Sequence, residues 1–128
     1  MPEDYIFQKA SEVKLLLLDV DGVLTDGRIV YDSRGHDMKS FDVHDGLGVY
    51  LLKKSGIPTI LITAKGSRAI RPRAKDMRVD AVFADISPKS SVLGKILNKY
   101  KISGKNRPKN KYINSVIEKN FFFILVLP

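Results

Sequence analysis

Short apolar runs alternate along this chain with longer segments in which apolar and polar residues recur at helical spacing. The apolar runs have the length of buried strands and cover residues 14–18, 58–62 and 80–84. Between the first two of them, residues 28–41 contain two short extended segments around a Ser-Arg-Gly turn, which predicts a β-hairpin. Three strand–helix repeats predict an α/β fold of the Rossmann-like type, with a parallel sheet and right-handed crossovers.

The segments that follow these strands carry helix signals. The first begins at Asp45, ends before Gly56, and has a predicted core stripe of Leu47, Tyr50 and Leu51. The second contains Pro72, which costs about 3 kcal/mol inside a helix, so we expect Pro72 to be its first residue. The third follows Ser87 as N-cap and Pro88 as first residue, and its apolar stripe is Val92, Leu93, Ile96, Leu97 and Tyr100.

Polar side chains follow each predicted strand at its carboxyl end. Asp19 and Asp21 come directly after four leucines, Thr63 ends the second strand, and Lys89 lies in the turn after the third. Ligands of parallel sheets bind at this edge, so these residues are expected to meet there. Lys89 falls in the first turn of its predicted helix, where the helix dipole disfavours a cation unless an anion is bound nearby.

These residue types together can perform phosphoryl transfer. A carboxylate such as Asp19 can attack phosphorus to form an aspartyl-phosphate, and Asp21 can protonate the leaving alcohol and then activate water. Gly22 allows a sharp turn next to the phosphate. Thr63 and Lys89 can complement the phosphoryl oxygens, and Mg²⁺ can bridge carboxylate and phosphate.

The segments DVDGVLTDG, FDVHDGLGVYLLKKSGI, ILITA and SPK resemble the haloacid dehalogenase superfamily of phosphohydrolases. The resemblance is greatest to its capless branch, typified by the 3-deoxy-D-manno-octulosonate 8-phosphate phosphatases of lipopolysaccharide biosynthesis, and runs from about residue 13 to about residue 100. It implies a parallel sheet with a β-hairpin flap, dependence on Mg²⁺, an acidic sugar phosphate as substrate, and assembly into a homotetramer through the flap.

The resemblance also implies roles for individual residues. Asp19 would be the nucleophile and a metal ligand, Asp21 the acid/base with its carbonyl on the metal, and Thr63 and Lys89 would hold the phosphoryl group. The positions implied to contact substrate are Asp21, Asp42, Val43, His44, Asp45, Gly46, Tyr50, Lys65, Arg73 and Lys89.

The sequence departs from the family pattern in two regions. Thr63-Ala64-Lys65 replaces the usual Thr-Gly-Arg, and Tyr50 stands where arginine is common. After Tyr100 the family continues with a fourth strand that ends in Gly-Asp-Asp, whereas Glu118 is the only acid after Asp85 here. We therefore expect an incomplete phosphatase domain at 1–103 and an atypical tail at 104–128. A frameshift or early stop near residue 103 would explain the tail and predicts a Gly-Asp-Asp motif in another reading frame; a replacement strand formed by FFFILVL is the alternative.

Charge and composition limit the other functions. The formal net charge is +8, but residues 1–100 hold 16 Lys and Arg against 13 Asp and Glu, so most of the excess lies in the tail. Without cysteine there is no disulfide or thiolate chemistry, and the polar amino-terminal residues are unlike a secretory signal. We expect a cytoplasmic protein with no membrane or nucleic-acid partner.

The predicted function is Mg²⁺-dependent hydrolysis of an acidic sugar phosphate through an aspartyl-phosphate. The alternative is a catalytically impaired remnant that binds phosphate or oligomerises, because the fourth acidic motif is absent. Two further alternatives are a basic-tail interaction protein and a phospho-accepting receiver domain. The remaining interpretations are that Asp19 and Asp21 are only turn residues, that Thr63 is an ordinary strand end, and that His36 and His44 form a metal pair.

Overall fold

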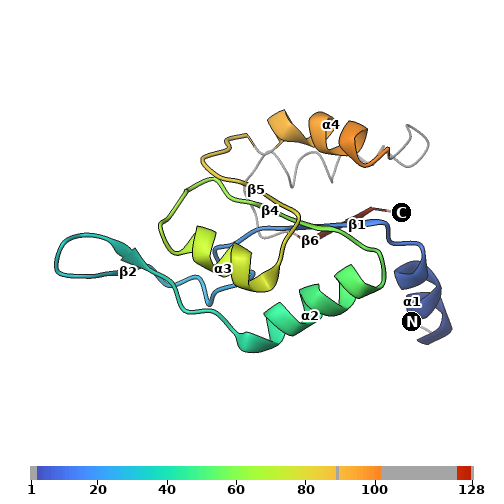
Figure 1. Ribbon diagram of the computed structural model, residues 1–128, viewed down its shortest axis with the longest axis horizontal. Coiled ribbons are helices and arrows are strands. Elements are labelled where there is room, and N and C mark those ends of the chain that lie inside the picture. The colour runs from blue at the N-terminus through green and yellow to red at the C-terminus, as the bar shows by residue number, and fades with distance from the viewer. Residues whose placement is uncertain (1–2, 89, 102–123, 128) are drawn as a thin grey trace.

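A computed structural model describes residues 3–88, 90–101 and 124–127 of the chain (Figure 1). Its main sheet has the strand order β5–β4–β1–β6. The strands are β1 (Leu15–Leu18), β4 (Thr59–Ile62), β5 (Ala81–Phe83) and β6 (Ile124–Leu127). β1, β4 and β5 are mutually parallel, which confirms the predicted α/β architecture over these three repeats.

β6 is antiparallel to β1, so the sheet is mixed and not parallel throughout. In this pairing Leu15 is opposite Leu127, and Leu18 is opposite Ile124. A strand from the apolar carboxyl-terminal segment thus joins the sheet, as the replacement-strand alternative requires. The expected domain boundary at residue 103 lies outside the described residues and stays a prediction.

Helices cover both faces of the sheet (Figure 1). α2 (Val43–Lys54) and α3 (Ile70–Met77) lie on one face, and α4 (Ser90–Lys99) lies on the other. α1 (Glu3–Ser11) precedes β1 at the end of the sheet opposite to the hairpin. The predicted hairpin forms from β2 (Val30–Tyr31) and β3 (Asp37–Met38), and it projects from the body of the domain.

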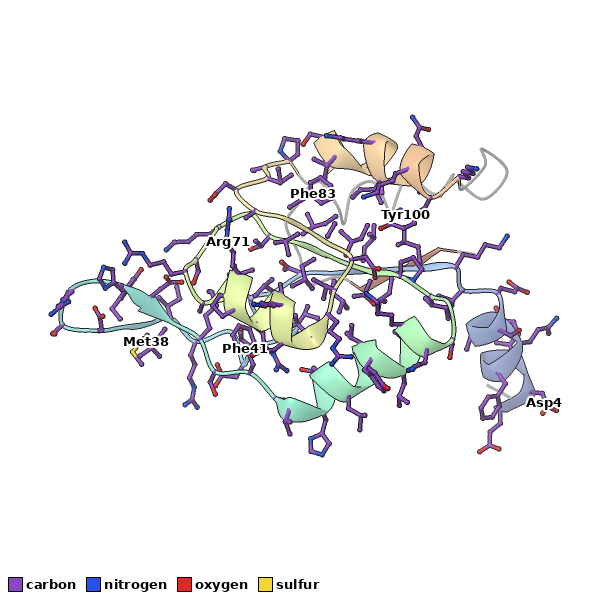
Figure 2. The ribbon with its side chains drawn as sticks, viewed as in Figure 1. Asp4, Met38, Phe41, Arg71, Phe83 and Tyr100 are labelled. Carbon is purple, nitrogen blue, oxygen red and sulfur yellow. The ribbon has the colours of Figure 1, made fainter. Side chains whose placement is uncertain are left out.

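Successive strand residues point to opposite faces, so the buried side chains form a core on each side of the sheet. Figure 2 shows Phe83 and Tyr100 between the sheet and α4, where both pack on this core. The core under α4 contains Leu15, Leu17, Ile60, Ile62, Ile96 and Leu97. The core under α2 and α3 contains Leu18, Val20, Leu24, Val49, Leu61, Ile70, Ala74 and Met77.

The predicted core stripe of α2 was wrong. Leu47 and Leu51 are 56% and 55% exposed, Tyr50 is 37% exposed, and Val49 is the buried residue at 4%. α2 carries apolar residues on more than one face, so helical spacing alone does not identify the packed one. The packed face includes Gly46, whose lack of a side chain lets the Arg73 guanidinium approach; a Cβ there would lie 3.3 Å from Arg73 Nη2.

Three helices begin elsewhere than predicted. α2 begins at Val43, after the N-cap Asp42, and not at Asp45. α3 begins at Ile70 and not at Pro72, which is its third residue. This placement is compatible with proline because the first backbone N–H groups of a helix have no acceptor within the helix. α4 begins at Ser90, two residues after Pro88. Its predicted stripe is confirmed, since Ile96 and Leu97 are buried and Val92, Leu93 and Tyr100 pack against the same core.

Shortening the central leucine of β1 should destabilise the fold. Leu17 is fully buried, and a buried Leu→Ala change removes transfer free energy and leaves a cavity, so Leu17→Ala should lower the free energy of unfolding by about 2–5 kcal/mol. Leu51→Ala is the control, because that side chain is 55% exposed and its loss should cost no more than about 0.5 kcal/mol. If urea-induced unfolding shows that Leu17→Ala and Leu51→Ala lower the free energy of unfolding equally, this assignment of the core is contradicted.

Candidate active site

Asp19 and Thr63 are buried at the carboxyl ends of two adjacent parallel strands. Asp19 follows β1 and is 7% exposed, and Thr63 follows β4 and is 1% exposed. The pairing of Leu18 with Leu61 brings these two strand ends to the same edge of the sheet. The predicted meeting of these residues at one edge is therefore found in the structure.

The carboxylate of Asp19 is oriented by its own turn. The Val20 backbone N–H donates a hydrogen bond of 2.8 Å to Asp19 Oδ1. A buried carboxylate needs such partners because its solvation is lost. Asp19 is thus held at the strand end in a defined orientation, as a nucleophile must be.

The turn after Asp19 carries Asp21 to the surface of the site. The Thr25 hydroxyl oxygen accepts hydrogen bonds from the Gly22 N–H at 2.9 Å and from the Gly27 N–H at 3.2 Å. Gly22 has φ +78°, a left-handed conformation that favours glycine. Asp21 therefore lies in a tight turn, and its side chain is 45% exposed.

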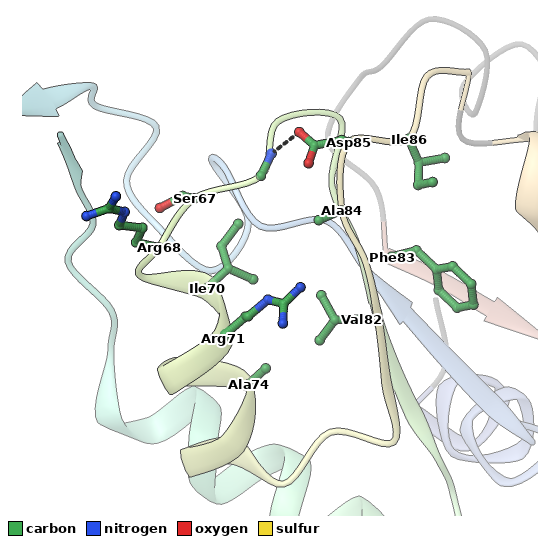
Figure 3. Close-up of a pocket in the computed structure, with 11 residues that line it drawn as sticks. Ser67, Arg68, Ile70, Arg71, Ala74, Val82, Phe83, Ala84, Asp85 and Ile86 are labelled. Carbon is green, nitrogen blue, oxygen red and sulfur yellow. Dashed lines mark hydrogen bonds between the residues drawn. The ribbon is translucent and has the colours of Figure 1, made fainter. Parts of the chain in front are cut away.

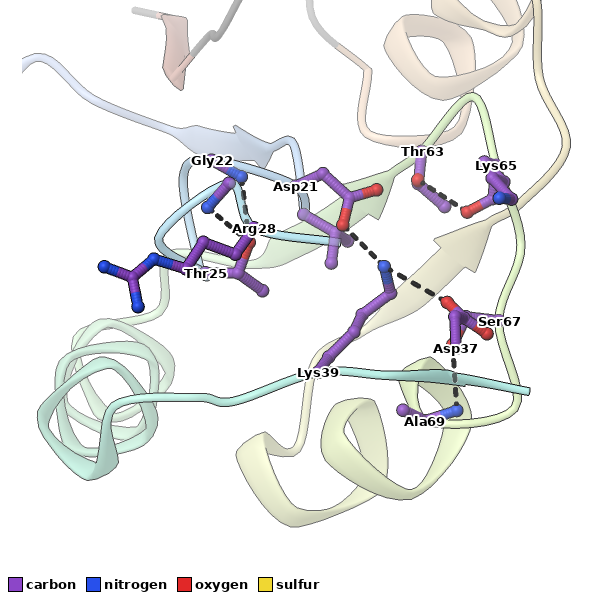
Figure 4. Close-up of polar contacts among 12 residues, drawn as sticks. Asp21, Gly22, Thr25, Arg28, Asp37, Lys39, Thr63, Lys65, Ser67 and Ala69 are labelled. Carbon is purple, nitrogen blue, oxygen red and sulfur yellow. Dashed lines mark hydrogen bonds and ion pairs between the residues drawn. The ribbon is translucent and has the colours of Figure 1, made fainter. Parts of the chain in front are cut away.

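Lys39 from the hairpin contacts Asp21 and was missed by the sequence analysis (Figure 4). Its Nζ donates to Asp21 Oδ1 at 2.5 Å and lies 3.4 Å from Asp37 Oδ2, and its side chain is only 9% exposed. Burial alone would lower the pKa of Lys39, but hydrogen bonding and attraction from the two carboxylates outweigh it and raise that pKa. The available signal was strand alternation, which puts Asp37 and Lys39 on the side opposite the exposed Met38.

Thr63 and Lys65 form the second side of the site (Figure 4). Thr63 Oγ1 donates to the Lys65 carbonyl at 3.1 Å, which curves the loop after β4. Lys65 Nζ lies 5.8 Å from the ring centroid of Tyr31 on the hairpin. A cavity of about 140 Å³ results, and it is lined by Asp21, Gly27, Arg28, Ile29, Val30, Asp37, Met38, Lys39 and Lys65.

The segment at the start of α2 borders a different cavity. Asp42 is the N-cap of α2 and accepts from the His44 N–H at 2.8 Å and contacts the His44 ring Nδ1 at 2.7 Å. These hydrogen bonds, from the backbone first and the ring second, hold the pKa of Asp42 below its usual value. Asp42, His44 and Asp45 line a cavity of about 450 Å³ together with Val23, Leu24, Thr25, Asp26, Ser40 and Phe41.

The guanidinium of Arg73 joins α3 to this segment. Arg73 Nη2 donates to the Asp42 carbonyl at 2.7 Å, and the guanidinium carbon lies 5.5 Å from the Phe41 ring centroid. Neither Arg73 nor Tyr50 lines the two cavities described above. Tyr50 instead lies beneath Lys54 of α2 and Arg78, the C-cap residue of α3. Substrate contact by either residue stays a prediction.

The remaining residues that were predicted to contact substrate lie at the start of α2 or outside the described residues. Val43 is 75% exposed at the first position of α2, and Gly46 lies against Arg73 in the next turn. Lys89 lies outside the described residues. The structure thus brings Asp19, Asp21 and Thr63 to one edge and places Lys65 beside Asp21, while the segment 42–46 borders a separate cavity.

The oxygens of Asp19 and Asp21 are the hard ligands that Mg²⁺ prefers. Within the part of the chain that the structure describes, no group of three or more His, Cys, Asp or Glu side chains comes together to bind a metal. The ligand types therefore fit Mg²⁺, but the described residues supply fewer carboxylates than a dedicated site would.

A hydrogen bond also links the loops that follow β4 and β5 (Figure 3). The Gly66 N–H donates to Asp85 Oδ1 at 2.8 Å, and Asp85 adopts φ +59°, which is uncommon for a residue with a side chain. Both residues border a cavity of about 880 Å³ between α3 and β5, away from Asp19 and Asp21. The link fixes the loop that carries Thr63 and Lys65 against the loop that precedes α4.

Adding a methyl group at Gly66 should break this link. The new Cβ would lie 2.7 Å from Asp85 Oδ2, so Gly66→Ala should lower the free energy of unfolding by about 1 kcal/mol through the lost hydrogen bond. In an Asp85→Gly background the same change should cost less, because the obstructing carboxylate is gone. A double-mutant cycle by denaturant unfolding measures the difference, and an equal cost in both backgrounds would contradict the proposed contact.

No protein-family model matches the chain. A 3-deoxy-D-manno-octulosonate 8-phosphate phosphatase from Haemophilus influenzae is 40% identical over 76 residues, which are 59% of this chain and 42% of that protein. The crystal structure of the corresponding phosphatase from Moraxella catarrhalis, in complex with magnesium, phosphate and KDO, matches with a TM-score of 0.73 and 39% identity over 79% of this chain and 58% of that chain. A haloacid dehalogenase superfamily hydrolase (subfamily III A) from Legionella pneumophila matches with a TM-score of 0.73 and 30% identity over 78% and 55%.

The chain spans about half the length of the relatives that it matches. Over its α/β domain this chain is similar in sequence and in backbone structure to 3-deoxy-D-manno-octulosonate 8-phosphate phosphatases and to a hydrolase of the haloacid dehalogenase superfamily.

Proposed function

We propose that this chain is a Mg²⁺-dependent phosphomonoesterase that acts through an aspartyl-phosphate, on 3-deoxy-D-manno-octulosonate 8-phosphate or a related acidic sugar phosphate. The observation that carries the proposal is the pair of carboxylates after β1. Asp19 is buried and oriented by the Val20 N–H, and Asp21 is displayed two residues later at the mouth of a cavity. A buried nucleophile beside an accessible acid is the pairing that phosphoryl transfer through a carboxylate requires.

In the first step an Asp19 carboxylate oxygen attacks phosphorus. The new bond joins that oxygen to phosphorus, and the bond between phosphorus and the ester oxygen breaks. The proton carried by Asp21 goes to the departing alkoxide, so the sugar leaves as a neutral alcohol. Thr63, whose hydroxyl donates to the Lys65 carbonyl, would donate instead to a phosphoryl oxygen of the substrate.

In the second step the aspartyl-phosphate is hydrolysed. Asp21, now a carboxylate, takes a proton from a water molecule whose oxygen attacks phosphorus. The bond between Asp19 and phosphorus breaks, inorganic phosphate leaves, and both carboxylates return to their starting states. One residue thus serves as acid and then as base.

Mg²⁺ would be held by the Asp19 carboxylate and the Asp21 backbone carbonyl, and it would neutralise the charge of the phosphoryl oxygens. Because Mg²⁺ prefers octahedral oxygen coordination and the described residues provide no third carboxylate here, we expect weak binding of the metal to this chain.

The cavity beside Asp21 supports an acidic substrate. Arg28 and Lys65 contribute two cations to its lining, whereas the charge of Lys39 is offset by Asp21 and Asp37 in the same lining. Lys65 stands in the loop after β4, where the resemblance implies an arginine, and a lysine provides a point charge instead of a bidentate contact. We therefore expect binding of an anionic sugar with a relaxed preference among related sugar acids.

Phosphate release from a panel of sugar phosphates, with Mg²⁺ or with EDTA, tests this function. The expected result is turnover that is greatest with octulosonate 8-phosphate and that disappears in EDTA. Neutral sugar phosphates of similar size are the matched controls for the cationic cavity. Turnover that persists unchanged in EDTA, or a preference for the neutral sugars, would contradict the proposal.

The second candidate is a catalytically impaired remnant that binds phosphate. The observation in its favour is that β6, which pairs with β1, belongs to the tail in which the fourth acidic motif is absent. This candidate predicts a soluble, folded chain with millimolar or undetectable affinity for Mg²⁺ and no release of phosphate. Calorimetric titration with Mg²⁺ therefore distinguishes it from the enzyme.

We also propose that the protein forms a homotetramer in the cytoplasm. Four hairpin side chains support self-association because they are large, apolar and exposed, and they are Ile29, Val30, Tyr31 and Met38. Among the described residues no helix is long and apolar enough to cross a membrane. Sedimentation velocity is the test of assembly, and a protein that remains monomeric at micromolar concentration would rule it out.

A further inference from the structure

A buried ammonium group connects the hairpin to the candidate acid/base. Lys39 follows β3, and its Nζ donates to Asp21 Oδ1 at 2.5 Å while Asp37 Oδ2 lies 3.4 Å away (Figure 4). The side chain is 9% exposed although the hairpin itself projects into solvent. A lysine buried in this way keeps its charge only with carboxylate partners, so its position depends on both aspartates.

The contact extends beyond this pair. Asp37 also hydrogen-bonds with the Ser67 side chain in the loop after β4, and Ser67 Oγ accepts from the Ala69 N–H at 3.1 Å. A continuous set of polar contacts thus runs from the turn after β1, through the hairpin, to the start of α3 (Figure 4). The loops that carry Asp21 and Lys65 are joined through Lys39.

Asp21 needs such support because its turn leaves the side chain 45% exposed. An exposed aspartate samples several rotamers, whereas an acid/base must hold its oxygen within hydrogen-bonding distance of the ester oxygen. Removing Lys39 would leave the carboxylates of Asp21 and Asp37 without the cation between them, so that they repel each other. Asp21 would then turn away from its place in the cavity.

We propose that Lys39 is a positioning residue that holds the Asp21 carboxylate in place and couples the hairpin to proton transfer at the leaving group. This inference rests on the proposed phosphatase function. The hairpin would thus support proton transfer by the Asp21 of the same protein chain, in addition to any role in assembly.

Kinetics with two kinds of substrate test this role. In Lys39→Met, kcat for an alkyl sugar phosphate should fall about 10- to 100-fold, because a misplaced catalytic group costs that much. The burst rate of p-nitrophenolate release, which reports formation of the aspartyl-phosphate, should fall much less because p-nitrophenolate leaves without a proton, and KM for both substrates should change little. Lys39→Arg should restore part of the sugar phosphate rate.

Lys53→Met is the matched control. Lys53 also pairs with an aspartate, Asp80, at 3.5 Å, and its side chain is 48% exposed at the other end of α2. This variant should leave both rates unchanged. If Lys39→Met lowers both rates equally, or leaves both unchanged, Lys39 does not position Asp21 for proton transfer and the inference is overturned.

Amide hydrogen exchange tests the coupling without turnover. Asp21→Ala and Lys39→Met should both accelerate exchange in the hairpin at residues 30–38, whereas Lys53→Met should not. Hairpin exchange that is unaffected by Asp21→Ala would overturn the inference even in an inactive chain. By contrast, faster exchange in both variants together with no phosphate release from the wild type would support the coupling while rejecting the proposed function.

Discussion

Replacing Asp19 by asparagine should reduce phosphate release by about 10⁴-fold or more, because loss of a covalent nucleophile removes the pathway that the remaining residues assist. Asparagine has nearly the same shape, and its amide oxygen can still accept the 2.8 Å hydrogen bond from the Val20 N–H. The fold should therefore survive. Initial rates of phosphate release, with the unfolding midpoint of each variant, measure the two effects separately.

Asp26→Asn is the matched control for this substitution. Asp26 lies on the same turn, is exposed, and accepts a 3.0 Å hydrogen bond from the Arg28 N–H. Its change should leave the rate within about twofold of the wild type, because Asp26 does not line the cavity beside Asp21 and substitutions of exposed residues are usually close to neutral. An Asp19→Asn variant that keeps several per cent of the wild-type rate would mean that another group attacks phosphorus.

Replacing Asp21 by asparagine should lower kcat for an alkyl sugar phosphate by about 10²- to 10⁴-fold, the usual contribution of a general acid or base. Formation of the aspartyl-phosphate from p-nitrophenyl phosphate should be less affected, because that leaving group needs no proton. Hydrolysis of the intermediate should still be slow, since no base activates water. A rapid burst of p-nitrophenolate followed by slow turnover is the expected time course.

A loss in Asp21→Asn that is the same for both substrates, with no burst, would assign Asp21 a different role. Thr25 provides the control for the turn itself, because its hydroxyl oxygen accepts from the Gly22 and Gly27 N–H groups. Thr25→Ser keeps these hydrogen bonds and should leave the wild-type time course and turnover unchanged.

The strand ends could be predicted from sequence because their signals are local. Four leucines followed by Asp19 and Asp21 specify a buried strand and a polar turn within a few residues. Because strands and helices alternate along the chain, neighbouring strands of the sheet pair in parallel. Parallel pairing brings Thr63 to the same edge of the sheet as Asp19. No long-range contact had to be known for this part of the site.

The features that sequence reasoning missed depend on contacts between distant residues. Lys39 and Asp21 are 18 positions apart, and no periodicity in the hairpin identifies which carboxylate its lysine approaches. Leu47 and Leu51 match a helical stripe as well as Val49 does, so the choice of face depends on the close approach of Arg73 to Gly46. The antiparallel direction of β6 likewise depends on its pairing with β1 and not on its composition.

The central claim is that Asp19 becomes covalently phosphorylated, and chemical trapping tests it most directly. Asp21→Asn protein would be incubated with Mg²⁺ and p-nitrophenyl phosphate and then treated with borohydride, which reduces an acyl phosphate to an alcohol. Peptide mass spectrometry should find homoserine in place of Asp19, and no such change in the Asp19→Asn, Asp21→Asn double variant. An unmodified Asp19 peptide from folded protein that releases p-nitrophenolate would contradict the account.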